Sequence, residues 1–502
     1  MIRSLLVANR GEIAVRIVRA ARERGIRTIA VYSEPDRLAP HVLAADEAYA
    51  IGPAPSAESY LVAERLIEVA KRAKADAIHP GYGFLAERAL FAQAVEDAGL
   101  IFVGPRSETI TAMGDKTEAR RRMAAAGVPI VPGLTESVAD PEAAVVAARD
   151  VGYPVLLKAS AGGGGRGMRV VEREEDLPRA FDAAQREALA AFGDDAVYLE
   201  RYLDSPRHVE IQVLGDAHGN VVHLGERECS IQRRHQKLVE EAPSPAITQE
   251  ERAAMGEAAV RAAQAVAYRG AGTVEFLYQN GDFFFLEMNT RIQVEHPVTE
   301  LVTGIDLVDW QLRVASGEAL DFTQADVVMS GHAIECRITS EDPLSGFLPS
   351  TGVVTRLEIP SGAGVRWDGG IHEGFEVSLH YDPLLAKLIV HGASREIAIA
   401  RMARALDELV ITGIETSASF HRRVMDEPDF RAGTFSIRYL DEHTELLESD
   451  TSEEALRAAA LAAALLEDED RLRHRIPRIG ASAQVEMSSW RAAGWPWRKG
   501  IS

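Results

Sequence analysis

The chain has 502 residues, of which 46% are apolar and 26% charged. That length corresponds to about three or four domain-sized units or one large interlocked enzyme, and the composition is that of an ordinary globular protein. The net charge of -21 argues against a general binder of nucleic acids or anionic membranes, because both are polyanions. Any anion that binds must meet a local cationic pocket.

The cysteines and the apolar runs indicate the compartment of the protein and whether it crosses a membrane. Cys229 and Cys336 are the only cysteines, too few for a disulfide framework or a thiolate zinc site, and they predict reduced thiols in a cytoplasmic protein. Arg10 and Glu12 come before any signal-peptide core could form. No apolar run approaches the roughly 18 residues of a membrane helix. The run at 458–466 is interpreted as a packed helix.

The first part of the chain alternates strands and helices. Short apolar runs at 4–8, 28–32, 77–78 and 100–103 predict strands, and helical periodicity at 13–21, 60–73 and 91–98 predicts helices between them. This alternation predicts a doubly wound parallel sheet over residues 1–114.

The later parts follow other patterns. Strands at 155–158 and 168–171 enclose a glycine loop, and a helix at 177–191 and a strand at 197–202 complete a unit small enough to be a lid. Alternation at 209–214, 221–226, 272–278 and 283–288 predicts antiparallel strands, with a helix at 250–267. A strand-rich block runs from 332 to about 444, and one alanine-rich helix follows. The predicted fold class is therefore mixed α/β and α+β, with several domains.

The glycine loop follows Lys158, and five of the six residues 162–167 are glycine. Consecutive glycines let backbone N–H groups converge on an anion, and the lysine can neutralise a phosphate. The pattern is neither a P-loop nor a dinucleotide fingerprint. A flexible hairpin tip is the alternative, but so many glycines raise the entropy cost of folding, which favours a phosphate-binding flap.

Two glutamates are placed for a metal site. Glu275 and Glu287 lie in two predicted strands, and Asn289 follows two residues after Glu287. If the strands are neighbours, their oxygens face one point and suit Mg²⁺ or Mn²⁺. Exposed glutamates on strand edges are the alternative.

A charged segment follows directly. Arg291 offers a planar fork for a carboxylate or bicarbonate, and Glu295 could act as a general base. An extended conformation would place Arg291, Gln293 and Glu295 on one side. A salt-bridged loop before Pro297 is the alternative.

Several blocks in order resemble the ATP-grasp superfamily and, within it, the biotin carboxylases, over about residues 1–445. They are Asn-Arg-Gly-Glu-Ile-Ala at 9–14, His-Pro-Gly-Tyr-Gly-Phe-Leu at 79–85, Gly-Asp-Lys at 114–116, the glycine loop, 226–237 and 287–296. The resemblance implies an ATP-grasp fold with a mobile lid. It divides the chain into an N-terminal domain, a connecting helix, the lid, a central ATP-grasp domain, a C-terminal biotin carboxylase domain and an extension, at 1–114, 115–130, 131–203, 204–331, 332–445 and 446–502.

The resemblance also implies roles for individual residues. ATP would be bound by Lys116, Lys158, Gly164, Gly165, Glu200, Arg201, Leu203, His208, Gln232, His235, Glu275 and Glu287, with the adenine hinge at Glu200, Arg201 and Leu203 acting largely through the backbone. Two Mg²⁺ or Mn²⁺ ions would be held by Glu275, Glu287 and Asn289. Bicarbonate would be bound by Lys237, Arg291, Gln293, Val294 and Glu295. Biotin would be bound by Arg337, Tyr82 and Gly83. The catalytic set would be Arg291, Glu295, Lys237 and Arg337.

The implied reaction is ATP-dependent carboxylation of biotin with bicarbonate through carboxyphosphate. No Ala-Met-Lys-Met attachment sequence occurs, so biotin would arrive on a separate carrier protein, with a carboxyltransferase on another chain. The resemblance implies a cytoplasmic homodimer within an acetyl-CoA or other acyl-CoA carboxylase of fatty acid biosynthesis. The alternatives are another ATP-grasp carboxylate–amine ligase, a non-catalytic nucleotide-binding scaffold or a pyruvate carboxylase subunit. The final acyl acceptor and the base that deprotonates biotin N1 stay open.

Overall fold

The computed structural model describes residues 1–134, 137–159, 168–448 and 453–474. It divides into two compact units, Met1–Leu447 and Glu448–Ser502. Gly164 and Gly165, predicted to close over ATP, lie outside the described residues.

The N-terminal part contains the predicted parallel sheet. Its strand order is β3-β2-β1-β4-β5 and all its pairings are parallel. The strands are β1 (Ser4–Val7), β2 (Arg27–Ser33), β3 (Glu47–Gly52), β4 (Ala77–His79) and β5 (Ile101–Phe102). The edge strand β3 was missed by the sequence pattern because Ile51 is its only fully buried residue.

Helices cover both faces of this sheet. Leu6 packs into one apolar cluster with residues of α3 and α4, whereas Leu5 packs into another with residues of α1 and α11. The helices here are α1 (Gly11–Glu23), α2 (Pro40–Ala44), α3 (Ala63–Arg72), α4 (Ala89–Asp97) and α5 (Ser107–Gly114), and α11 (Leu307–Ala315) joins from later in the chain. Helix α3 begins later than predicted, because Tyr60 lies in a loop where its hydroxyl donates to Asp36 at 2.6 Å.

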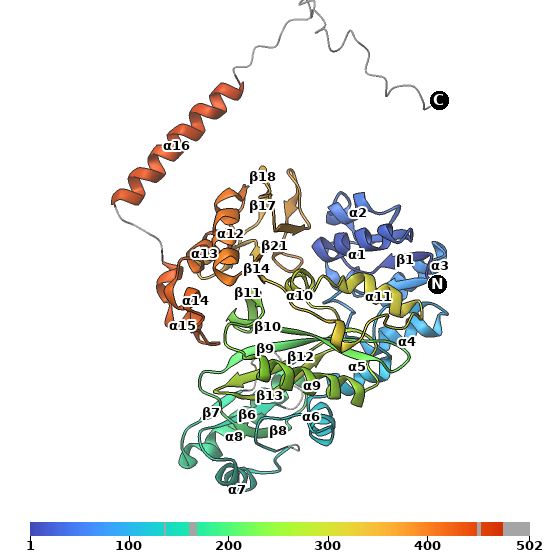
Figure 1. Ribbon diagram of the computed structural model, residues 1–502, viewed down its shortest axis with the longest axis vertical. Coiled ribbons are helices and arrows are strands. Elements are labelled where there is room, and N and C mark those ends of the chain that lie inside the picture. The colour runs from blue at the N-terminus through green and yellow to red at the C-terminus, as the bar shows by residue number, and fades with distance from the viewer. Residues whose placement is uncertain (135–136, 160–167, 449–452, 475–502) are drawn as a thin grey trace, which may run out of the picture. The chain divides into compact units, whose positions relative to one another are not determined.

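An eight-stranded antiparallel sheet forms the centre of the first unit, with the order β13-β12-β9-β10-β11-β14-β21-β19 (Figure 1). Its strands are β9 (Arg207–Gly215), β10 (Val221–Arg233), β11 (Gln236–Ala242), β12 (Gly270–Gln279), β13 (Asp282–Asn289), β14 (His332–Thr339), β19 (Val365–Gly369) and β21 (Leu384–Gly392). Because β11 pairs with β14, the sheet continues across the predicted boundary at 331/332. The predicted boundary therefore falls within one continuous sheet. The division of the chain into domains stays a prediction.

Helices and short strand pairs surround the large sheet. The helices are α9 (Gln249–Ala265), α10 (His296–Thr303), α12 (Arg395–Glu408), α13 (Ala418–Val424), α14 (Pro428–Ala432) and α15 (Tyr439–Glu442). The short pairs join β15 (Glu341–Asp342) to β16 (Leu348–Pro349), β17 (Gly352–Val353) to β20 (Glu376–Val377), and β18 (Arg356–Glu358) to β22 (Val410–Thr412). A capping box of Thr248 and Glu251 starts α9, which confirms the helix predicted there.

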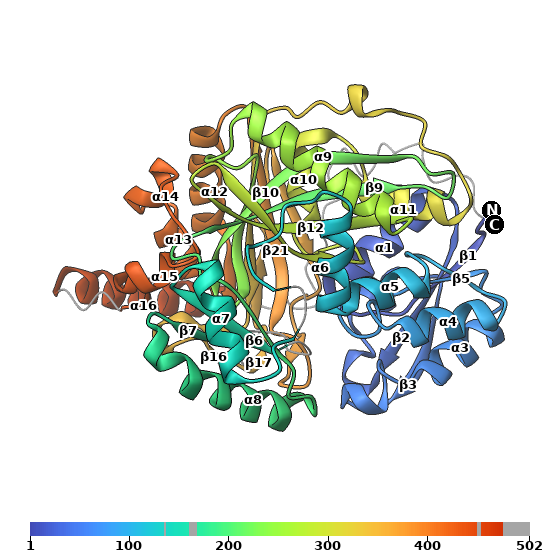
Figure 2. The ribbon, with the colours of Figure 1, turned by 90° about the horizontal axis from the view of Figure 1, so that it is seen from below.

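The predicted lid is a three-stranded sheet with two helices (Figure 2). Its elements are β6 (Val155–Ala159), β7 (Arg169–Val171), β8 (Val197–Arg201), α7 (Pro141–Val151) and α8 (Leu177–Phe192), and they share an apolar cluster of their own. Helix α6 (Lys116–Ala125) comes before them, and the Asp115 side chain caps it by accepting from the Glu118 amide. Movement of the lid stays a prediction.

The second unit contains α16 (Glu453–His474). This confirms the predicted helix, and within it Leu456, Leu461, Leu465 and Leu466 are each more than half exposed. The packing of the helix stays a prediction. Among the described residues, no helix combines the length and the apolar character needed to cross a membrane. Cys229 and Cys336 are both free and buried.

Gly133 allows the start of the lid to lie directly against β8. A Cβ atom there would lie 2.5 Å from the Leu199 carbonyl oxygen and 2.6 Å from the Glu200 Cα atom. We expect Gly133→Ala to lower the free energy of unfolding by about 1–3 kcal/mol through overpacking. Thermal unfolding of both proteins measures this.

Gly114→Ala is the matched control. A Cβ on Gly114 meets nothing within 4 Å, and the residue lies in α5, where alanine is the better helix former. Its unfolding temperature should equal or exceed that of the wild type. Equal stability of the Gly133→Ala variant would contradict the close approach.

Candidate active site

One cavity of about 1060 Å³ opens between the large sheet, the lid and the N-terminal part. Every predicted site residue that the structure describes lines it, although these residues come from distant parts of the chain. They are Tyr82, Gly83, Lys116, Lys158, Glu200, Arg201, Leu203, His208, Gln232, His235, Lys237, Glu275, Glu287, Asn289, Arg291, Gln293, Val294, Glu295 and Arg337.

The lid contributes one lysine, Lys158, to the lining of the cavity. Lys158 on β6 forms an ion pair with Glu200 on β8, and Arg120 donates to Glu200 at 3.0 Å. The buried side chain of Glu200 thus pairs with the ammonium group of Lys158, and the adenine-binding role of its main chain stays a prediction. The Arg201 side chain is exposed and its amide donates to the Pro132 carbonyl at 2.7 Å.

The carboxylate pair confirms the predicted strand neighbours. Glu275 and Glu287 are direct partners in the antiparallel pairing of β12 and β13. Burial and then the charge of Glu275 raise the pKa of Glu287. Burial also opposes ionisation of Glu275, but Lys237 and His208 outweigh it and hold its pKa well below the ordinary value. Glu275 is therefore a carboxylate in the folded protein.

The oxygen set fits a hard divalent cation by its chemistry. Glu275, Glu287 and Asn289 offer carboxylate and amide oxygens along one wall of the cavity. Glu275 Oε1 already accepts from Lys237 at 3.0 Å, Asn289 at 2.9 Å and Gln293 at 2.8 Å. Glu275 therefore belongs to the predicted metal site and also contacts residues of the predicted bicarbonate site.

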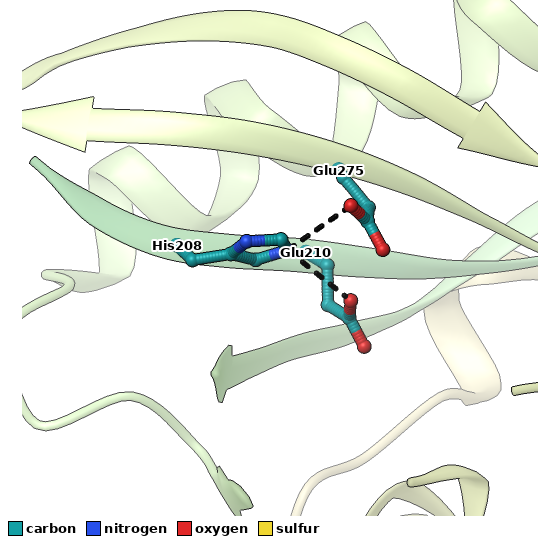
Figure 3. A group of neighbouring side chains, drawn as sticks. All are labelled: His208, Glu210 and Glu275. Carbon is teal, nitrogen blue, oxygen red and sulfur yellow. Dashed lines mark ion pairs between the residues drawn. The ribbon is translucent and has the colours of Figure 1, made fainter. Parts of the chain in front are cut away.

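His208 lies between two carboxylates, as Figure 3 shows. Its Nε2 atom is 3.2 Å from Glu275 and 3.7 Å from Glu210, which neighbours it on β9. Burial alone would lower the pKa of His208, but Glu275 and Glu210 together outweigh burial and raise the pKa to about 9. A protonated imidazole cannot ligate a metal, so these three residues form an ion-paired group.

The segment after Asn289 is not extended, and the predicted period-two spacing is absent. Residues 290–295 form a bend and a turn that lead into α10, where Pro297 occupies the first helical turn. We call this segment the 291–295 turn. Arg291 donates to Glu87 at 2.9 Å and to Asn289 Oδ1 at 3.0 Å. The turn, rather than a strand, thus brings its side chains to the cavity.

Lys237 joins three carboxylates that belong to different elements. Its Nζ atom lies 2.5 Å from Glu210, 3.0 Å from Glu275 and 2.6 Å from Glu295. We call Lys237, Glu210, Glu275 and Glu295 the Lys237 cluster. Burial opposes ionisation of Glu295, but Lys237, Arg337 and Arg227 together outweigh burial and lower the pKa of Glu295. Glu295 is therefore charged and able to accept a proton.

Arg337 extends this cluster along the sheet. Its guanidinium donates to Glu240 at 2.6 Å through Nε and to Glu295 at 2.9 Å through Nη2. Glu240 is fully buried. The sequence analysis did not identify it as a site residue.

Arg227 is a further residue to which the sequence analysis assigned no role, although it lies in the 226–237 block. It is fully buried and donates to Glu210 at 2.6 Å and to Gln293 Oε1 at 2.8 Å. Because Arg227 occupies the amide oxygen, Gln293 presents its Nε2 group to Glu275. The motif was the only available signal, since the partners come from other strands and from the turn.

Comparisons with known proteins decide the family. The chain matches the family descriptions "Biotin carboxylase, N-terminal domain" at 1–110, "Carbamoyl-phosphate synthase L chain, ATP binding domain" at 115–323 and "Biotin carboxylase C-terminal domain" at 335–442. It is 54% identical to the biotin carboxylase of Allochromatium vinosum over 88% of this chain and 98% of that protein. The chain belongs to the biotin carboxylase family.

Two further relatives extend the comparison. A pyruvate carboxylase subunit of Methanothermobacter thermautotrophicus is 55% identical over 88% of this chain and 90% of the relative. The biotin carboxylase domain dimer of Hydrogenobacter thermophilus 2-oxoglutarate carboxylase, solved with MgADP, ADP and bicarbonate, has a TM-score of 0.84 and 50% identity, covering 89% of this chain and 99% of that one. The chain is therefore an ATP-dependent biotin carboxylase with an ATP-grasp fold, and the scaffold and carboxylate–amine ligase alternatives are set aside.

We expect Arg227→Met to lower the free energy of unfolding by about 3–5 kcal/mol, because it leaves the buried Glu210 carboxylate short of a cation. Denaturant unfolding measures this. Arg404→Met is the control, since Arg404 makes an exposed ion pair with Glu408 on α12 and should change stability by less than about 1 kcal/mol. A similarly small effect of Arg227→Met would argue against the buried network.

His208 predicts a pH dependence of stability. Its folded-state pKa of about 9 lies above the ordinary 6.5, so its stabilising contribution is complete below pH 6.5 and is lost as the pH rises through about 9. Between these values the ligand-free wild type should lose up to about 3 kcal/mol more stability than His208→Gln. Parallel pH profiles of the two proteins would refute this assignment.

Proposed function

We propose that the cavity binds ATP at its lid end and bicarbonate beside the Lys237 cluster. Lys116 and Lys158 would neutralise the phosphates, and the main chain of Glu200, Arg201 and Leu203 would face the adenine. His208, Gln232 and His235 would contact the nucleotide. All these residues line the same cavity, which supports this assignment.

A divalent ion belongs to the same proposal. Glu275, Glu287 and Asn289 would hold Mg²⁺ or Mn²⁺, with two ions bound at turnover. The bound ion would neutralise charge on the phosphoryl group that is transferred. The raised pKa of Glu287 supports this placement, because a nearby cation would favour its charged form.

Bicarbonate would lie between Arg291, Lys237, Gln293 and the Val294 backbone. Glu295 would accept the proton of bicarbonate, and the freed oxygen would attack the γ-phosphorus of ATP to give carboxyphosphate and ADP. The depressed pKa of Glu295 keeps it in the base form, and its contact with Lys237 stabilises that charge. Holding both reactants in line removes most of the entropy cost of the encounter.

Biotin would approach from the side of Tyr82, Gly83 and Arg337. Carboxyphosphate would release CO₂ next to biotin N1, and Arg337 would stabilise negative charge on the ureido oxygen. The bond from Arg337 to Glu295 supports this placement, because it joins the two proposed half-sites.

Biotin would be carried on a separate protein, and a carboxyltransferase on another chain would use the product. Two relatives are themselves named as subunits of larger carboxylases, which supports this organisation. We further propose a cytoplasmic homodimer within an acetyl-CoA or other acyl-CoA carboxylase of fatty acid biosynthesis. The two free, buried cysteines fit that compartment. Relatives that act in pyruvate and 2-oxoglutarate carboxylation make those acceptors the second candidates.

We expect the purified chain to hydrolyse ATP only when bicarbonate and biotin are both present. Arg291→Ala should lower this rate by about 100-fold or more while leaving ATP affinity within about twofold, because Arg291 would contact the bicarbonate and not the nucleotide. Steady-state ADP release and equilibrium ATP binding measure the two effects. Retained turnover in the variant would contradict the role of Arg291, and biotin-independent hydrolysis by the wild type would contradict the proposal as a whole.

The final acceptor of the carboxyl group can be identified through the biotinylated protein that binds this chain. Capture of the biotinylated protein that copurifies with the native chain, followed by assay with acetyl-CoA, propionyl-CoA, pyruvate and 2-oxoglutarate, should give carboxylation of an acyl-CoA. Carboxylation of a 2-oxo acid alone would replace this part of the proposal with a second candidate.

A further inference from the structure

Lys387 is a fully buried lysine outside the proposed catalytic set. It lies on β21, directly opposite Arg337 in the pairing with β14. Burying an ammonium group is costly unless donors and charges are matched. The groups that contact the Lys387 ammonium therefore indicate its role in the structure.

The ammonium group contacts three separate segments. It donates to the Val294 carbonyl oxygen at 2.8 Å, within the 291–295 turn. It also lies 3.3 Å from Glu12, in the first turn of α1, and 3.9 Å from Asp368 on β19. Lys387 thus connects the predicted bicarbonate turn to the N-terminal part of the chain.

The contact with Val294 sets the direction of a peptide group. A peptide is planar and trans, so its N–H points opposite to its C=O. With the Val294 carbonyl directed at Lys387, the Glu295 N–H points the other way. The preceding peptide is held similarly, since His296 Nδ1 lies 2.7 Å from the Gln293 carbonyl oxygen.

Neither the Val294 nor the Glu295 amide has an acceptor among the residues that the structure describes. Successive backbone N–H groups in a turn are a common means of binding a small anion. Val294 and Glu295 both line the cavity.

Lys387 is also connected, through Glu12, to a second residue that lines the cavity. Glu12 is buried, and its Oε1 atom accepts from the hydroxyl of Tyr82, which lines the cavity. Burial favours the protonated form of Glu12 and raises its pKa to about 7, whereas Lys387 acts in the opposite direction. Loss of the lysine would leave this carboxyl without its cation.

We propose that Lys387 is a positioning residue that holds the Val294–Glu295 peptide for bicarbonate and joins it through Glu12 to Tyr82. The inference rests on the proposed placement of bicarbonate. Lys387 itself touches no reactant, so its effect should fall on bicarbonate affinity rather than on ATP.

The test is Lys387→Met, which keeps the length of the side chain and removes the charge and the donors. We expect the KM for bicarbonate to rise about tenfold or more, equivalent to about 1.4 kcal/mol, and the KM for ATP to stay within about twofold. Lys387→Gln, which keeps an N–H donor, should lie between Met and the wild type, and it replaces Met if that variant does not fold.

Arg395→Met is the matched control. Arg395 is largely buried and pairs with Glu241, and neither residue is among those that line the described cavity. It should lower the unfolding temperature without changing the KM for bicarbonate. An unchanged KM for bicarbonate in folded Lys387 variants would overturn the inference, whereas loss of bicarbonate dependence in the wild type would instead overturn the proposed function.

Discussion

The arrangement of the active site depends on charge balance around one buried ammonium group. Lys237 lies among Glu210, Glu275 and Glu295, which come from β9, β12 and the 291–295 turn. Each of these carboxylates would be costly to bury alone, and each is stabilised by the same cation. With Lys237 itself on β11, the cluster therefore connects three strands and a turn.

Further cations continue this pattern along the inner face of the large sheet. Arg227 balances Glu210 and orients Gln293, Arg337 bridges Glu240 and Glu295, and Lys387 lies beyond them. Fixed charges and oriented amides need little reorganisation when an anion binds. A protein with a net charge of -21 can thus attract bicarbonate and ATP locally.

The lid has a hydrophobic core of its own, and polar contacts join it to the segment that precedes it. Its apolar cluster is its own, while Arg120 donates to Glu200 and the Arg201 amide to Pro132 at its junction with the preceding segment. Glu200, at the predicted adenine hinge, also forms an ion pair with Lys158, for which we propose a phosphate-binding role. A self-contained lid of this kind is suited to closing over a nucleotide and excluding water.

Local pattern determined much of this protein. Apolar periodicity was enough to predict the parallel sheet, the lid and the antiparallel strands, and the ordered blocks from 9–14 to 287–296 pointed to the family. The pairing of Glu275 with Glu287 followed because adjacent strands of a hairpin carry their own register. Edge strand β3 escaped because too few of its residues are buried to leave a pattern.

Tertiary structure alone decided how the charged residues are used. The 291–295 segment alternates like a strand in sequence but forms a turn, because α10 begins at His296. The partners of Lys237, Arg227 and Lys387 are many residues away, and no spacing rule relates them. Sequence shows which charges exist, but their pairing is a long-range contact made only when the sheet assembles.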